Sequence, residues 1–240
     1  MITRQTILFV LIIFITNIIQ TITGFAGTVL AMPPSLLLVG ADVAKPILNG
    51  VAIFVSLIIV IFNFKKILWI EVLKMLLFIG IGFAGGFFIP EVVKNAKYIL
   101  IIYGVIVCLI AIFFFFFKPE KLKIPNWVLY IFLVLGGLLH NLFISGGPLV
   151  VIYARLKIED KDNFRGTLSF IWLVLNSILL GTHIYNGLWT ANSAIILAIG
   201  VAVTVGAIFL GRLIVKKINV DIFMKITCIL LFISGVSMFF

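Results

Sequence analysis

The chain has 240 residues, of which 64% are hydrophobic and only 11% are charged. This composition excludes an ordinary soluble domain, and the net charge of +10 indicates basic loops facing an anionic lipid leaflet rather than a nucleic-acid partner. Because runs of 18 or more apolar residues predict membrane helices, we expect an all-α, multi-pass protein of the cell membrane.

Eight apolar stretches follow one another, with nothing between them large enough to form a soluble catalytic domain. They are residues 6–40, 43–64, 67–89, 96–117, 127–154, 166–186, 190–211 and 221–240. About 20 residues cross a hydrocarbon core of about 30 Å, so each stretch is long enough to span a bilayer. The first has no small-residue cleavage site, and we expect it to be retained rather than removed as a signal peptide.

The first and fifth stretches are too long for one ordinary crossing, and each contains helix-breaking residues. These are Thr23, Gly24, Gly27 and Pro33-Pro34 in the first stretch, and Ser145, Gly146, Gly147 and Pro148 in the fifth. Glycine frees the backbone to turn and proline removes a donor, so both stretches are predicted to break at membrane depth. Unpaired backbone at that depth is tolerated only inside protein or along a water-filled cavity, which favours site-forming breaks; close helix packing at the glycines is the alternative.

The second half of the chain repeats the first at a constant offset of 120 residues. Matched residues of scarce types include Gly27 and Gly147, Asp42 and Asp162, Lys45 and Arg165, Trp69 and Trp189, and Cys108 and Cys228. We therefore expect two transmembrane repeats, residues 1–120 and 121–240. Fused copies of one apolar unit are common in secondary transporters, with the substrate at a midplane site where the copies meet; a structural duplication without transport is the alternative.

The distribution of basic residues separates two topologies. If every stretch crosses once, the 18 Lys and Arg divide seven to eleven between the two faces; if the first and fifth stretches enter, break and return, they divide four to fourteen. The cleaner partition favours re-entrant hairpins. Each repeat then has three crossings, so the repeats are inverted and both termini face outward.

The eight acidic residues all lie in or near loops and segment ends. Cation-coupled carriers normally keep a carboxylate at mid-membrane, so a cation pathway is poorly provided for. An anion pathway is better provided for, because a broken half-helix points its N-terminal N–H groups at a negative group. Neutral donors for such an anion include the Thr28 and Ser145 hydroxyls, the backbone amides of Gly146 and Gly147, and the side-chain amides of Asn17, Gln20, Asn141 and Asn176.

Lys45 and Arg165 each follow an aspartate by three residues at the start of a predicted helix. Asp42 and Asp162 fit helix N-caps, whereas a cation at that position opposes the helix dipole. The same mismatch in both halves favours attraction of an anion. Snorkelling of the cation to lipid headgroups, or a salt bridge to its own aspartate, is the alternative.

His140 lies five residues before Ser145, close to the predicted break. A membrane histidine can relay protons near neutral pH, and it can equally form a hydrogen bond to a neighbouring helix. The two cysteines lie inside apolar stretches, where packing is the favoured role. We expect no metal and no cofactor.

Two short motifs resemble the signatures of the TauE/SafE sulfite-exporter family. The first is Gly24-Phe25-Ala26-Gly27 followed by Pro33 and the run 35–38, and the second is Ser145-Gly146-Gly147-Pro148 followed by Tyr153. The duplicated eight-segment layout is similar to that family over essentially the whole chain, although Ala26 and Thr28 stand where the family is often glycine-rich. The resemblance implies movement of sulfite, sulfonates or related small sulfur-containing anions across the cell membrane, in either direction.

We therefore expect a secondary transporter for a small sulfur-containing anion such as sulfite or an organosulfonate, working by alternating access around a midplane site. The alternative is a substrate-binding membrane subunit of an ATPase-driven importer, which needs no internal symmetry. An enzyme is not expected, because no paired acids, metal-ligand cluster or nucleophile–base spacing occurs. The expected partners are the anion and the lipid bilayer. The residues expected at the site are Thr23, Gly24, Phe25, Gly27, Thr28, Pro33, Lys45, Asn141, Ser145, Gly146, Gly147, Pro148 and Arg165, with His140 as the candidate proton relay.

Overall fold

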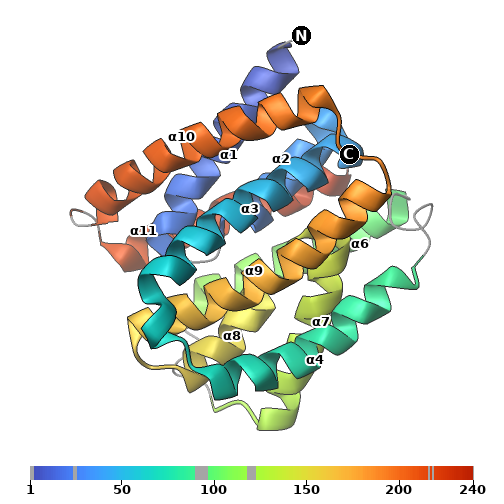
Figure 1. Cartoon of the computed structure of the whole chain (residues 1–240). Helices are drawn as coiled ribbons and strands as arrows, with labels where there is room; N and C mark the ends of the chain where they lie inside the picture. Colours follow the sequence, from blue (N-terminus) through green and yellow to red (C-terminus); the bar gives the residue numbers. More distant parts are fainter. Residues whose placement is uncertain are drawn as a thin grey trace. The chain divides into compact units, whose positions relative to one another are not determined.

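The computed structural model describes residues 3–23, 26–89, 97–117, 123–215, 217 and 219–239, and every element in this part of the chain is a helix (Figure 1). The helices are α1 (Arg4–Thr23), α2 (Gly27–Val39), α3 (Ala41–Asn63), η1 (Phe64–Lys66), α4 (Trp69–Phe87), α6 (Lys97–Phe116), α7 (Asn126–Phe143), α8 (Gly147–Lys157), α9 (Lys161–Tyr185), α10 (Ala191–Val215), α11 (Val220–Val236) and η3 (Ser237–Phe239).

Eight segments of the described residues are long and apolar enough to cross a membrane, and each overlaps one of the eight predicted stretches. Large apolar side chains on these helices are exposed, for example Phe62 at 80% and Leu73 at 70%, as lipid-facing residues are. The prediction of an all-α, multi-pass membrane protein is confirmed. The short helix α2 is apolar but too short to span on its own.

The chain divides into two compact units, and each unit draws helices from both halves of the sequence. Unit 1 comprises residues 1–48, 90–118 and 188–240, and unit 2 comprises residues 49–89 and 119–187. Unit 1 therefore contains α1, α2, the start of α3, α6, α10 and α11, whereas unit 2 contains the rest of α3 with α4, α7, α8 and α9. The repeats expected at residues 1–120 and 121–240 stay a prediction.

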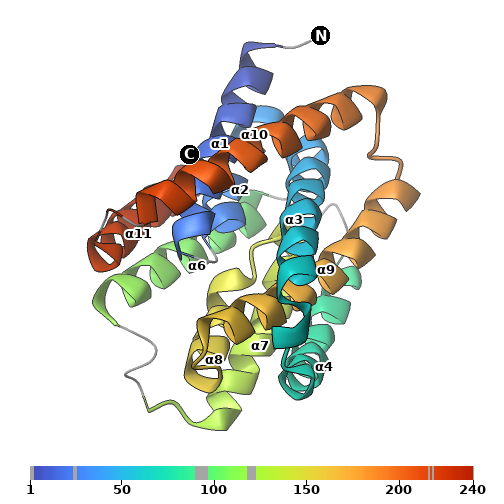
Figure 2. The same ribbon diagram turned by 60° about the vertical axis from the view of Figure 1, so that its left-hand side comes forward.

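In unit 1, small residues bring helices from the two halves close together. α1 packs on α10 (Figure 2), and Gly211 of α10 faces the side chain of Thr21. α6 packs antiparallel to α11, where Gly104 faces the backbone of Gly235 and the Cys108 thiol lies 3.6 Å from the carbonyl oxygen of Phe232. Close backbone approach through glycine is a usual way for helices to associate in membranes. Both cysteines are free and buried, as expected of packing residues.

The two prolines of α2 do not interrupt it, so the predicted break lies before Gly27 rather than at Pro33 and Pro34. A proline inside a helix leaves the carbonyl four residues earlier without its usual donor. The carbonyl freed by Pro34 is that of Leu30, and it accepts a hydrogen bond from Ser234 Oγ of α11 at 3.4 Å. Substitution of a neighbouring hydroxyl for the missing amide is how membrane helices tolerate proline.

In unit 2, α4 and α7 run parallel and in close contact. Gly82 of α4 lies against the backbone of Val134, Gly137 of α7 lies against the backbone of Ile79, and neither position has room for a Cβ atom. Further along the same helix pair, the ring of Phe78 stacks on Tyr130, with centroids 4.2 Å apart.

Equivalent helices pair in a reciprocal pattern. At the offset of 120 residues α4 corresponds to α10 and α7 to α1, and the pairs that form are α4 with α7 and α10 with α1. α6 corresponds to α11, and these two pack against each other antiparallel. An inverted repeat requires opposite directions of equivalent helices, and the inversion of the repeats stays a prediction.

Candidate functional site

The α7–α8 segment of unit 2 doubles back on itself. α7 ends at Phe143, and α8 returns antiparallel along it, so that Lys157 Nζ at the end of α8 donates a hydrogen bond of 2.9 Å to Asn126 Oδ1 at the start of α7. Midway, the rings of Tyr130 and Tyr153 lie 6.3 Å apart. The segment therefore begins and ends at the same end of unit 2. Its placement in a bilayer stays a prediction.

The reversal depends on an uncommon backbone conformation. Ile144 has φ 55° and ψ 27°, the left-handed region that a β-branched residue rarely occupies, and its amide donates to the carbonyl oxygen of His140 at 2.8 Å. Strain of this kind is concentrated at functional sites. Ser145 Oγ donates to the carbonyl oxygen of Phe143 at 2.8 Å, which closes the turn.

The packing and backbone geometry at the start of α8 explain why the sequence Gly146-Gly147-Pro148 occurs there. Gly146 is buried with its Cα against the carbonyl of Gly136, so any Cβ at this position would overlap that oxygen. Pro148 lies in the first turn, where a helix has no acceptor for an amide hydrogen and a proline costs nothing. As the N-cap residue, Gly146 brings no side chain to bind the first amides of α8. The start of α8 is therefore a buried, positive helix end that its N-cap residue leaves without a side-chain cap.

A neutral polar network lies beside this helix start. His140 Nε2 is 3.1 Å from Asn176 Oδ1 of α9, and Asn49 Nδ2 of α3 donates to the backbone carbonyl of Asn176 at 3.0 Å. His140 is 3% exposed, Asn176 1% and Asn49 0%. The Cβ atom of His140 would lie 3.0 Å from a Cβ placed on Gly146, so network and helix start adjoin.

Three side-chain atoms of this region have no hydrogen-bond partner within the described ranges: His140 Nδ1, Asn141 Nδ2 and Asn49 Oδ1. Asn141 is 8% exposed, and its side chain lies against Gly86 of α4, where an added Cβ would be 2.5 Å from its Oδ1. Buried polar groups almost always find partners, and leaving them bare in an apolar interior costs several kcal/mol each. Three such groups in one part of unit 2, with His140 against the start of α8, favour a place that receives water or a polar ligand.

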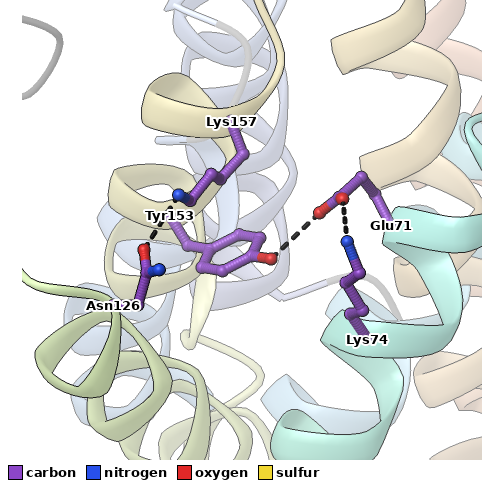
Figure 3. Close-up of polar contacts among 5 residues, drawn as sticks. All are labelled: Glu71, Lys74, Asn126, Tyr153 and Lys157. Carbon is purple, nitrogen blue, oxygen red and sulfur yellow. Dashed lines mark hydrogen bonds and ion pairs between the residues drawn. The ribbon is translucent and has the colours of Figure 1, made fainter.

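A second polar cluster holds the far end of α8 (Figure 3). Tyr153 Oη donates to Glu71 Oε2 at 2.9 Å, and Lys74 Nζ donates to Glu71 Oε1 of the same carboxylate at 2.8 Å. Arg155 lies over the ring of Phe164, 4.7 Å from its centroid. α8 is thereby tied to α4 and α9 as well as to α7, which fixes the axis along which its N-terminus points.

All charged residues among the described part of unit 2 lie toward this same end. They are Lys65, Lys66, Glu71, Lys74, Lys123, Arg155, Lys157, Glu159, Asp160, Lys161, Asp162 and Arg165. By the positive-inside rule, the excess of basic side chains predicts that this end faces the cytoplasm. Within the described residues of the whole chain, no Asp, Glu, Lys or Arg is buried and no three metal-ligand side chains gather.

The structure brings some of the expected site residues together. Asn141, Ser145, Gly146, Gly147, Pro148 and His140 share the α7–α8 reversal of unit 2. Arg165 is an exposed residue near the start of α9, eleven residues before Asn176 and so about 16 Å from it along the helix axis. Asp160 caps α9 by accepting the amides of Asp162 and Asn163, so the assignment of the cap to Asp162 is wrong.

The remaining expected residues belong to unit 1. Gly27 begins α2 and is buried against the side chain of Gln20, with no room for a Cβ. Pro33 is buried, while Thr28 and Lys45 are half-buried. Thr23 is the last residue of α1, and Gly24 and Phe25 lie outside the described residues. The polar groups of α1 mostly bond to their own helix, as Asn17 does to the carbonyl of Ile13 at 2.8 Å.

The comparison with family models decides which class of membrane protein has this arrangement. The model of the sulfite exporter TauE/SafE family matches residues 9–238, nearly the whole chain. The chain belongs to the sulfite exporter TauE/SafE family. The resemblance drawn from the two glycine motifs is thus confirmed. Neither the curated proteins nor the solved structures gave a match.

For this TauE/SafE protein, two functional candidates escaped the sequence reasoning. Asn49 is a polar residue within the apolar sequence of α3. A single polar side chain among apolar ones was the only sequence feature that could have indicated a role for it. Glu71 was recognised only as an acid near a segment end, because its bond to Tyr153 spans 82 positions and no local pattern predicts it.

Proposed function

We propose that the chain is a permease for a small sulfur-containing anion such as sulfite or an organosulfonate, and that unit 2 binds this anion at the start of α8. The observation that carries the proposal is the buried N-terminus of α8, which its N-cap residue leaves without a side-chain cap, beside a network of neutral polar side chains. The family description, a sulfite exporter, supports membrane transport of an anion rather than catalysis.

The chemistry of the site favours an anion over a cation. Amide N–H groups and the positive end of a helix dipole stabilise negative charge, and together they form a common anion-binding arrangement. A cation site needs several oxygen ligands with negative charge, and no carboxylate is buried among the described residues. A neutral site also releases its ligand more readily than one with a fixed lysine or arginine, which suits a carrier.

Small size follows from the close packing around the start of α8. Gly146 touches the backbone of Gly136, and Val150 lies 2.8 Å from a Cβ placed on Gly136, so the two helices leave little space between them. A compact sulfur oxyanion offers several acceptor oxygens within the reach of one helix turn. The expectation of alternating access around a midplane site at the repeat interface stays a prediction.

Uptake by proteoliposomes tests the function directly. Purified full-length protein should carry labelled sulfite or methanesulfonate into vesicles faster than protein-free vesicles do, and a small amine or sugar should not be carried. Uptake of neither sulfur anion, with correctly inserted and folded protein, would refute the proposal. Uptake of an amine instead would show that the site prefers cations to anions.

A further inference from the structure

The ring of His140 is held on three sides, and one of its nitrogens is left without a partner. The ring stacks on Trp172 of α9 at a centroid distance of 5.0 Å, and Phe83 of α4 lies at 6.2 Å. Its Nε2 is 3.1 Å from Asn176 Oδ1, whereas its Nδ1 has no partner among the residues that the structure describes. Packing this tight fixes the ring and points the unpartnered nitrogen in one direction.

The bond to Asn176 determines which nitrogen carries hydrogen. An amide oxygen only accepts, so Nε2 is the donor and the neutral ring keeps a lone pair on Nδ1. A proton that binds at Nδ1 therefore leaves the bond to Asn176 intact. Asn49 Oδ1 is a second buried acceptor that has no donor among the described residues, so this part of unit 2 holds two acceptor atoms that could receive a hydrogen bond.

A charged imidazolium in this place has no counter-ion among the residues that the structure describes. The ring contacts Phe83 of α4 and Trp172 and Asn176 of α9, and the Cβ atom of His140 lies against Gly146 at the start of α8. None of these groups ionises, and an unpaired buried charge is expensive. His140 will bind a proton readily only when a negative charge arrives beside it.

The start of α8 is where such a negative charge would arrive. The Cβ atom of His140 lies 3.0 Å from a Cβ built on Gly146, so an anion on the first amides of α8 is separated from the ring by no more than one side chain. Each charge then offsets the burial cost of the other. We propose that unit 2 binds its anion together with one proton, and that His140 holds this proton at Nδ1.

This inference rests on the proposed function and adds the co-substrate. The lone pair of Nδ1 forms one N–H bond when the proton binds, and the same bond breaks when proton and anion leave together; no other bond changes. A monovalent anion with one proton moves without net charge. A pH gradient therefore drives accumulation of the anion, whereas the membrane potential does not.

Methanesulfonate is the suitable probe, because a sulfonate stays ionised from about pH 5 to pH 8, the range in which histidine titrates. In proteoliposomes that contain a pH-sensitive dye, inward flux of labelled methanesulfonate should acidify the lumen. Flux without acidification would overturn the inference and leave anion transport standing. Absence of any methanesulfonate or sulfite flux would refute the proposed function, and the inference with it.

Affinity measured against pH tests the residue. Linkage of one proton makes the dissociation constant of methanesulfonate fall by up to about tenfold for each unit that the pH is lowered. His140→Gln should abolish this slope. His183→Gln is the matched control, because His183 is the other histidine of the chain and is also buried, and it should keep the wild-type slope. A wild-type slope in His140→Gln would contradict the assignment, and if that variant does not fold, the acidification measurement on the wild type decides.

Discussion

Asn141 is buried, yet its amide nitrogen has no acceptor among the described residues. Its side chain is accommodated only because residue 86 is glycine. A residue selected for packing at this place would be apolar, since an unsatisfied buried donor costs about 1–3 kcal/mol. The cost is understandable if the amide donates to a bound anion part of the time.

Replacing this amide separates a binding role from a packing role. Asn141→Leu keeps the branched shape and removes the bare donor, so we expect the ligand-free protein to be as stable as the wild type or more stable. Binding of methanesulfonate should weaken about tenfold, the usual value of a hydrogen bond to a charged group. Thermal unfolding without ligand and titration calorimetry with it measure the two effects.

Asn17→Leu is the control for this comparison. Asn17 is also a buried amide, but its Nδ2 already donates to the carbonyl of Ile13 in its own helix. We expect its loss to leave anion affinity unchanged. Asn141→Leu with lower stability and unchanged affinity would return Asn141 to a purely structural role.

At the scale of the residue, the sequence predicted those candidate groups that lie near a recognisable local motif. Asn141 and His140 were identified because they lie within a few positions of a Ser-Gly-Gly-Pro break. Asn49 was not, because one amide in an apolar helix can face lipid, protein or water, and only packing decides. The cap of α9 was misplaced from Asp160 to Asp162 for a related reason, since both acids lie at the helix start and geometry selects between them.

At the scale of the element, the α7–α8 reversal is the feature that positions the proposed site. Its break was predictable, because Gly146 is required where two backbones touch and Pro148 is tolerated only in a first turn. The prolines of α2 were misread, because Ser234 from a distant helix supplies the donor that keeps α2 intact. Contacts between distant segments, such as Tyr153 with Glu71, have no local signature.

Cysteine accessibility tests whether this reversal returns to its own side of the membrane. The two native cysteines, Cys108 and Cys228, are first replaced by serine or alanine. Single cysteines at Lys123 and at Glu159 should then be labelled by an impermeant reagent from the same side, the cytoplasmic one. Labelling from opposite sides would show that residues 126–157 cross the membrane completely and would remove the hairpin topology.

At the scale of the whole molecule, the compact units do not follow the two halves of the sequence. The offset of 120 residues divides the chain at its middle, whereas α4 packs with helices of the second half and α10 with helices of the first. Sequence similarity between the halves shows which helices are equivalent. It does not show which helices of one half pack against helices of the other half. The membrane class, the eight spans and the family were accessible from composition and motifs, because they depend on residue types rather than on contacts.

The thermal stability of the purified chain with a matched pair of ligands tests the central claim most directly. Methanesulfonate and dimethyl sulfone are similar in size and carry a similar sulfur–oxygen group, but only the first is negatively charged. A ligand that binds the folded state raises the unfolding temperature in proportion to its saturation. An anion site at the start of α8 predicts a rise in unfolding temperature that grows with methanesulfonate concentration, and no rise with dimethyl sulfone. Equal stabilisation by both compounds, or none by methanesulfonate or sulfite at any concentration, would contradict the account.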